Sequence, residues 1–235
     1  SAKGALELHA NGVRYVAGAR GSAGTLDILF ADVARAFFQP AVNSSSCEFR
    51  DDTVRLHLRL RRPIAIGKKK ATDVQFVTVL SSEDSINLSE TLRRARSMYD
   101  PDEINAERRE RERRSRVNHL FRDFCKKMQL ESAKLEDPCG KIKFEVPKAK
   151  SELTFTGRAS SSVRSGASIT GETHFLPTRH CLVGLCQQPF FVAEIASLEM
   201  AYCERVDSGL KYFDLVLVNK DRESFLRIDS IPIAK

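Results

Sequence analysis

The clearest pattern in the chain is a strict alternation of apolar and basic residues between positions 54 and 61. The apolar positions are Val54, Leu56, Leu58 and Leu60, and the positions between them hold Arg55, His57, Arg59 and Arg61. A period of two is typical of a half-buried β-strand, because alternate side chains point to opposite faces. The pattern therefore predicts a strand that buries its apolar row and keeps its basic row in water.

Short apolar stretches separated by turn residues fill the rest of the first hundred positions. We expect strands at 6–9, 13–16, 26–30, 33–38 and 74–80 beside the alternating strand. Asn11-Gly12 separates the first two stretches, and this dipeptide is a strong hairpin signal. Evenly spaced short strands favour an antiparallel barrel or sandwich, so we expect a mainly β fold.

A long helix is predicted at 101–130. Asp100 is suited to the N-cap and Pro101 to the first turn. An apolar stripe at helical spacing follows in the second half of this segment, formed by Val117, Leu120, Phe121, Phe124 and Met128. The first half, 107–116, is almost entirely charged. We expect the stripe to pack on the preceding sheet and the charged half to face solvent or a partner.

The second half of the chain repeats the strand-rich pattern of the first. Asp137-Pro138-Cys139-Gly140 ends the helical pattern, so we expect two domains, 1–135 and 136–235. Strands are predicted at 142–146, 153–155, 181–186, 190–195, 198–206, 213–218 and 225–228, with a flexible loop at 156–173. The spacing Phe30-x-x-Val33-x-x-Ala36-Phe37 matches Ile195-x-x-Leu198-x-x-Ala201-Tyr202. This match indicates either a duplicated unit or a turn that any antiparallel barrel contains.

Composition narrows the classes of partner. The chain has 235 residues, 42% of them hydrophobic, with a net charge of +7 and a pI near 9.2. Nucleic acid, acidic protein and anionic lipid are the partners that such a charge favours. No segment has the roughly 20 apolar residues of a membrane span, and no secretory signal is visible. Six cysteines without a CxxC pair favour reduced thiols in a cytosolic or nuclear setting.

The sequence contains no recognisable catalytic or cofactor motif. It lacks a Gly-rich phosphate loop, a GxSxG elbow and an HExxH pair. His174, His180, Cys181 and Cys186 match no zinc template, and core packing explains them better. We therefore expect a protein that is not an enzyme and that uses neither a metal nor a cofactor.

Basic residues are the candidates for a binding surface. No acid interrupts the sequence between Asp52 and Asp73, whereas an ordinary solvated face mixes both signs. The candidate binding residues are Arg55, His57, Arg59, Arg61, Arg62, Lys68, Lys69, Lys70, Arg158 and Arg164. An ordinary exposed strand face, with the long stems of arginine and lysine lying along it, is the alternative reading.

Several strings of residues closely resemble the middle domain of the large subunit of the FACT histone chaperone. They are Leu26-Asp27-Ile28-Leu29-Phe30, Ala36-Phe37-Phe38-Gln39-Pro40, Pro63-Ile64-Ala65-Ile66-Gly67-Lys68-Lys69-Lys70, Asp73-Val74-Gln75-Phe76, Tyr99-Asp100-Pro101-Asp102-Glu103-Ile104, Pro189-Phe190-Phe191-Val192, Glu204-Arg205-Val206, Gly209-Leu210-Lys211-Tyr212-Phe213-Asp214 and Arg227-Ile228-Asp229-Ser230-Ile231-Pro232. The resemblance implies tandem pleckstrin-homology-like (PH-like) antiparallel barrels, the first capped by the long helix. It further implies a nuclear, chromosomal module that binds core histones, chiefly the tetramer of histones three and four. Nucleosome disassembly and reassembly in transcription, replication and repair are the processes that it implies.

The sequence departs from the resemblance in two places. Residues 147–180 hold a longer Ser/Gly-rich insertion, and the chain stops before the helix expected to cap the second barrel. Contact with the flanking histone dimer is therefore not expected, and the small FACT subunit is expected to bind outside this chain. The alternative function is nonspecific DNA binding by the basic strand face, while phosphoinositide binding follows only from analogy with the fold.

Overall fold

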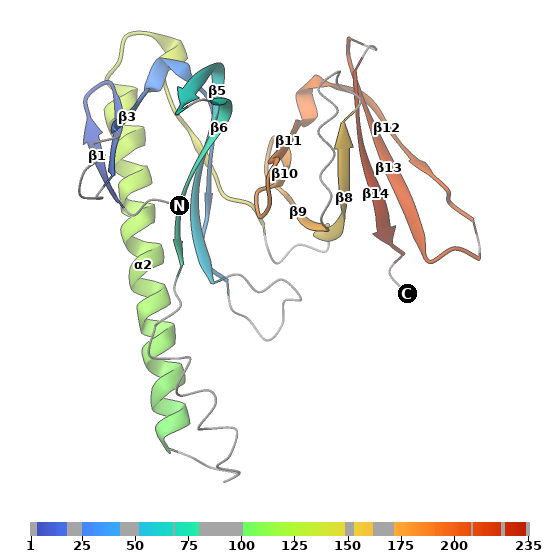
Figure 1. The fold of residues 1–235 in the computed structure, drawn as a ribbon, viewed down its shortest axis with the longest axis horizontal. Coiled ribbons are helices and arrows are strands. Elements are labelled where there is room, and N and C mark those ends of the chain that lie inside the picture. Colours follow the sequence, from blue (N-terminus) through green and yellow to red (C-terminus); the bar gives the residue numbers. More distant parts are fainter. Residues whose placement is uncertain are drawn as a thin grey trace. The chain divides into compact units, whose positions relative to one another are not determined.

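The structure is a computed structural model of the chain, and it describes residues 4–17, 25–42, 52–67, 69–79, 101–148, 153–161, 172–207, 209–221 and 224–233. The chain divides into two compact units, Ser1–Glu145 and Val146–Lys235, called unit 1 and unit 2 below. Each unit is built mainly of strands, and unit 1 carries one long helix (Figure 1). The expected mainly β fold with one long helix is confirmed. None of the described helical segments is long and apolar enough to cross a membrane.

Unit 1 contains two sheets in the described residues. The first is an antiparallel sheet of β1 (Gly4–His9), β2 (Gly12–Ala17) and β3 (Thr25–Leu29). The second has the order β6-β5-β4-β7, with β4 at Val33–Gln39, β5 at Thr53–Ile66, β6 at Lys69–Val79 and β7 at Phe144–Glu145. The predicted Asn11-Gly12 hairpin is confirmed, because His9 pairs with Gly12 across the β1–β2 turn.

The alternating segment forms β5, and its apolar row enters the core as predicted. Leu56 and Leu58 are fully buried in the cluster that joins both sheets to the helix. The prediction that the basic row stays in water is wrong for Arg55, which is 9% exposed, and for His57, which is 0% exposed. A polar side chain is tolerated in the interior when it has a partner, and His57 has one in Asp73 of the neighbouring β6.

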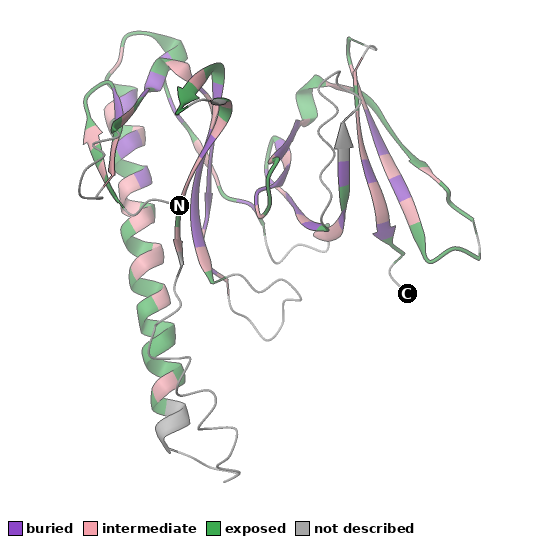
Figure 2. Ribbon diagram, in the orientation of Figure 1, coloured by how far each residue is buried: buried purple, intermediate pink, exposed green. Residues whose placement is uncertain are grey.

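Helix α2 spans Pro101–Ala133, close to the predicted limits. Its C-terminal half contributes the buried residues Cys125 and Met128 to the core of unit 1, with Val117, Phe121 and Phe124 partly buried beside them. Arg122 lies over the ring of the buried Phe38, with 5.9 Å between its guanidinium carbon and the ring centre. The charged half extends past the sheets and is mostly exposed from Glu107 onward (Figure 2).

One member of the predicted apolar stripe does not pack. Leu120 is 61% exposed, whereas Phe121 and Phe124 contact the core. Successive helical residues are rotated by about 100°, so the packed residues Val117, Phe121, Phe124, Cys125 and Met128 form a face centred near Met128. Leu120 therefore lies at the edge of that face. The sequence spacing predicts Leu120 inside the stripe because it lies three residues after Val117 and four before Phe124.

A side chain that the sequence analysis missed fastens α2 to β4. The Asn118 side chain donates from Nδ2 to the carbonyl oxygen of Ala41 at 3.1 Å. Its Oδ1 accepts the backbone N–H of the same residue at 2.9 Å. An asparagine amide is suited to this double bond because it both donates and accepts. The helix is thus held against the end of β4 by two hydrogen bonds beside its apolar stripe.

The described strands of unit 2 form one antiparallel sheet with the order β11-β10-β9-β8-β14-β13-β12. The strands are β8 (Phe155–Ser161), β9 (Thr173–Pro177), β10 (Cys181–Gly184), β11 (Phe191–Glu194), β12 (Leu198–Glu204), β13 (Tyr212–Asn219) and β14 (Phe225–Pro232). Residues 156–161 belong to β8, which corrects the expected loop at 156–173 over that part. The two compact units meet after Glu145, and β7 still pairs with β4 in unit 1.

The internal match found in the sequence corresponds to a repeated structural element. Phe30 and Ile195 each open a short 3-10 turn, η1 (Phe30–Asp32) and η3 (Ile195–Ser197), and β4 or β12 follows at once. The N–H of Phe30 donates to the carbonyl of Asn11 at 2.9 Å, and the N–H of Ile195 donates to that of His180 at 2.9 Å. In unit 1 this bond ties the 3-10 turn to the β1–β2 turn, and in unit 2 it ties the 3-10 turn to the β9–β10 turn, with two strands between the two turns in each case. The shared arrangement supports duplication over a chance match.

Candidate binding surfaces

The basic row of β5 is not a continuous cationic surface. His57 Nε2 lies 3.2 Å from Asp73 Oδ1, and Arg59 is the cross-strand partner of Asp73. Burial acts to raise the pKa of Asp73, but the hydrogen bond from His57 and the charge of Arg59 outweigh it. The pKa of Asp73 therefore lies below its usual value. A carboxylate held ionised at this position balances part of the positive charge that the sequence suggested.

Exposed cations lie beyond the buried part of the row. Arg61, Arg62 and Lys70 are all exposed at the end of the β5–β6 hairpin. Arg62 has an acidic neighbour, because its Nε lies 3.8 Å from Asp32 Oδ1. Gly67, with a φ of 62°, makes the turn in the left-handed region that glycine adopts without strain. Lys68 and the side chain of Lys69 lie outside the described residues.

The two candidates from the predicted loop have different outcomes. Arg158 is exposed on β8, where it is the cross-strand partner of Asp229 on β14. Arg164 lies outside the described residues. The structure thus gathers Arg61, Arg62 and Lys70 at one hairpin and places Arg158 in the other unit. The role of all these residues in binding stays a prediction.

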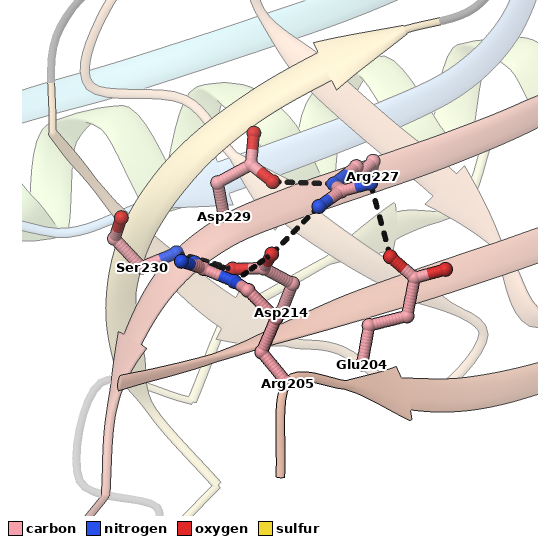
Figure 3. Close-up of polar contacts among 6 residues, drawn as sticks. All are labelled: Glu204, Arg205, Asp214, Arg227, Asp229 and Ser230. Atoms are coloured by element: carbon pink, nitrogen blue, oxygen red, sulfur yellow. Dashed lines mark hydrogen bonds and ion pairs between the residues drawn. The ribbon is translucent and has the colours of Figure 1, made fainter. Parts of the chain in front are cut away.

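A dense polar cluster among the described side chains of unit 2 centres on Asp214 of β13 (Figure 3). The Asp214 side chain is buried and accepts N–H groups from three residues. Arg227 Nη2 donates to Oδ2 at 2.7 Å and the backbone N–H of Ser230 donates to Oδ1 at 3.0 Å. Arg205 donates from Nε to Oδ2 at 2.6 Å and from Nη2 to Oδ1. Asp214 of β13 is therefore the common acceptor for the residue just after β12 and for two residues of β14.

Two further acids complete this cluster, which we call the Asp214 cluster. Arg227 Nη1 lies 3.0 Å from Glu204 Oε2, and its Nε donates to Asp229 Oδ1 at 2.5 Å. The three acids and two arginines are Glu204, Asp214, Asp229, Arg205 and Arg227. The hydrogen bonds of Arg205, opposed by burial, lower the pKa of Asp214 to about 2. The bonds to Asp229 and Asp214 raise the pKa of Arg227.

The cluster fixes the backbone of the hairpin around it. Arg205 and Ser230 have φ values of 56° and 59°, a region in which residues other than glycine are uncommon. Both residues bond to Asp214, so the buried carboxylate holds two unusual backbone turns in place. These residues belong to the strings that carry the resemblance, but no local pattern in the sequence indicates their contact. Their separation along the chain hid the contact.

Apolar side chains border the Asp214 cluster on the same face of the sheet. Directly paired residues share a face, and Met200, Val218 and Phe225 form one such row across β12, β13 and β14. Met200 is 52% exposed and Phe225 42%. Tyr202 lies in the next row, opposite Val216, and is 40% exposed. We call Met200, Tyr202, Val218 and Phe225 the outer apolar row of unit 2.

Fold and surfaces together define a class of protein: a duplicated antiparallel β scaffold in which buried charges are paired and apolar side chains are exposed on one sheet face. Residues 1–128 match the family model for the PH-like domain of FACT complex subunit SPT16. Residues 167–235 match the model for the middle domain of the histone chaperone Rttp106-like family.

Curated relatives match the chain almost from end to end. FACT complex subunit SPT16 of Zea mays is 36% identical over 233 residues, which are 98% of the chain and 20% of that relative. The Arabidopsis thaliana protein of the same name is 35% identical over 238 residues, covering 97% and 19%. FACT complex subunit spt-16 of Caenorhabditis elegans is 34% identical over 218 residues, covering 93% and 18%. The chain belongs to the SPT16 family of FACT complex subunits, which confirms the resemblance, and it spans about a fifth of the length of these relatives.

Proposed function

We propose that this chain is a histone chaperone module that binds core histones, chiefly the tetramer of histones three and four. Its place is the nucleus and the chromosome, in the disassembly and reassembly of nucleosomes during transcription, replication and repair. Its family membership and the match of unit 2 to a histone chaperone model support this proposal. The mechanism is competition with DNA for the histone surface and involves no bond making. The small FACT subunit binds outside this chain.

The observation that carries the proposal is the outer apolar row of unit 2 beside the acids of the Asp214 cluster. Interfaces are enriched in Met, Tyr and Phe, and exposed groups of such residues mark binding surfaces. Unit 2 suits a basic partner better than unit 1 does. Residues 146–235 hold eleven basic and ten acidic residues, a net charge of +1, so +6 of the total +7 lies in residues 1–145.

The test is to titrate the chain against the tetramer of histones three and four and, separately, against the dimer of histones two A and two B. The variant Met200→Ser, Phe225→Ser removes two members of the outer apolar row. We expect it to bind the tetramer about tenfold more weakly or worse, as for residues at the centre of an interface. Leu130→Ser is the matched control, because Leu130 is an exposed apolar residue of α2. Equal affinity for tetramer and dimer would contradict the tetramer preference, and equal effects of both variants would contradict the surface.

DNA binding at the β5–β6 hairpin is the second candidate, favoured by the exposure of Arg61, Arg62 and Lys70. Such contacts to phosphate predict weak dependence on sequence and strong dependence on salt. The triple variant with glutamine at these three positions should lose affinity for a DNA duplex and keep its affinity for the tetramer. Unchanged DNA affinity would exclude this hairpin as the DNA contact.

A further inference from the structure

The exposed half of α2 carries arginines of two kinds. Residues 107–116 contain six arginines and three glutamates, and each glutamate is paired with a different arginine. Arg108 Nε lies 3.0 Å from Glu112 Oε1, and Arg111 Nη2 lies 3.9 Å from Glu107 Oε2. The third pair joins Arg114 to Glu110, and Arg114 Nη2 also lies 3.0 Å from Asp52 Oδ1. All three glutamates of residues 107–116 thus form an ion pair with an arginine of the same segment.

The other three arginines are Arg109, Arg113 and Arg116. All three are exposed, and no ion pair joins them to any acid among the side chains that the structure describes. Their spacing is i, i+4 and i+7, which places them on one face of a helix. We call them the arginine stripe. Residues 107–116 have a net charge of +3, and pairing by the three glutamates leaves that charge on a single face.

We propose that the arginine stripe binds the phosphate backbone of duplex DNA. A rise of 1.5 Å per residue makes the stripe about 10 Å long, and one DNA strand carries a phosphate every 3.4 Å or so along its axis, so about three phosphates face it. Guanidinium groups bind phosphate oxygens in pairs, and arginine is favoured over lysine at such contacts. The stripe is presented by the half of the helix that extends past the strands of unit 1, and all three of its arginines are exposed (Figure 1).

The proposal does not rest on the histone contact, since the stripe and the outer apolar row lie in different units. It also differs from binding at the β5–β6 hairpin, where Arg55 and His57 are buried and Asp73 balances the charge. The sequence does not single out these arginines of α2 as a binding surface, because charges of both signs alternate along 107–116. The ion pairs in the structure distinguish the three arginines that contact glutamates from the three of the arginine stripe.

The experiment measures binding of the full 235-residue chain to a fluorescent 30-base-pair DNA duplex over a range of salt concentrations. The stripe variant is Arg109→Gln, Arg113→Gln, Arg116→Gln. The control variant, Arg108→Gln, Arg111→Gln, Lys134→Gln, removes three exposed cations that already have acidic partners on the same helix. Glutamine is a good helix former, and far-ultraviolet circular dichroism checks that the helix is retained.

We expect the stripe variant to lose about tenfold or more in affinity near 0.1 M salt. The slope of log affinity against log salt should fall in magnitude by about 2.7, which corresponds to three phosphate contacts. The control variant should change the slope by less than about 0.9, the value for one phosphate contact. Binding to the histone tetramer should not weaken in either variant. Equal losses in both variants would show that net charge alone acts. Competition by poly-glutamate as effective as that by DNA would overturn the proposal in favour of an acidic protein.

Discussion

Replacing the buried acid of unit 2 tests whether the Asp214 cluster holds the last three strands together. Asp214→Asn keeps the size of the side chain but removes its charge and one of its two acceptor oxygens. The new amide N–H₂ group would face N–H donors of Arg205 and Arg227, which now donate to carboxylate oxygens. A buried donor left without an acceptor destabilises the folded state. We therefore expect a less stable unit 2.

The size of the effect follows from the pKa of Asp214. In the folded chain this pKa is lowered to about 2, mainly by the hydrogen bonds of Arg205, and an unfolded aspartate has a pKa of about 3.9. The difference corresponds to about 2.5 kcal/mol of stability at neutral pH. Arg205 is half exposed, so solvent screens part of its contribution. We expect Asp214→Asn to lower the free energy of unfolding by about 2 kcal/mol.

The assay is urea unfolding at pH 7, with hydrogen exchange of the β13 and β14 amides to localise the loss to unit 2. Asp27→Asn is the control, because it breaks the Arg14–Asp27 ion pair, which is exposed to solvent and should contribute far less to stability. The Asp214 pKa is lower in the folded chain, so the stabilisation is complete above about pH 4 and declines as the pH falls towards 2. The two proteins should converge over that interval. Equal losses in the two variants, or no convergence in acid, would refute the assignment.

Three further substitutions or treatments test the core of unit 1. Asn118→Ala removes both hydrogen bonds to the end of β4 and should cost about 1 to 3 kcal/mol in urea unfolding. Met128→Ala leaves a cavity in a fully buried site and should cost about 2 to 5 kcal/mol, whereas Leu130→Ala on the exposed face should cost less than about 0.5 kcal/mol by the same assay. Burial raises the pKa of the Cys125 thiol to about 12, so iodoacetamide at pH 8 should alkylate the exposed Cys139 well before Cys125, as followed by mass spectrometry of peptides.

The apolar pattern predicted the core better than the polar pattern predicted the surface. Leu56 and Leu58 are buried as the alternation requires, because an apolar residue on a strand face has few other stable positions. The burial of a basic residue is harder to predict from its local sequence, because an acidic partner elsewhere in the chain can allow it to be buried. His57 is buried beside an acid sixteen residues away, and only the strand register brings the two together.

Small residues explain why the sequence predicts a loop over most of β8. The segment contains Gly157 and Ala159 where larger apolar residues would mark a strand, so no apolar alternation is visible. Ala159 is nevertheless buried, with 3% of its surface exposed. A Cβ at Gly157 would lie 2.8 Å from Cγ2 of Ile228, so the close approach of β14 requires glycine there. The sequence cannot reveal this requirement, because it arises from a strand some seventy positions later.

The duplicated units have diverged in what they expose, and this divergence resolves an apparent conflict between a basic chain and basic histones. Unit 1 holds +6 of the net charge, and half of that excess lies on 107–116 of α2. Unit 2 is nearly neutral and exposes an apolar row whose neighbouring charges are already paired. Local charge decides affinity once two surfaces are in contact, because salt screens interactions beyond about 10 Å. A basic histone is therefore repelled near the basic surface of unit 1 but not near the almost neutral unit 2, so the proposed contact with unit 2 is compatible with a chain of net charge +7.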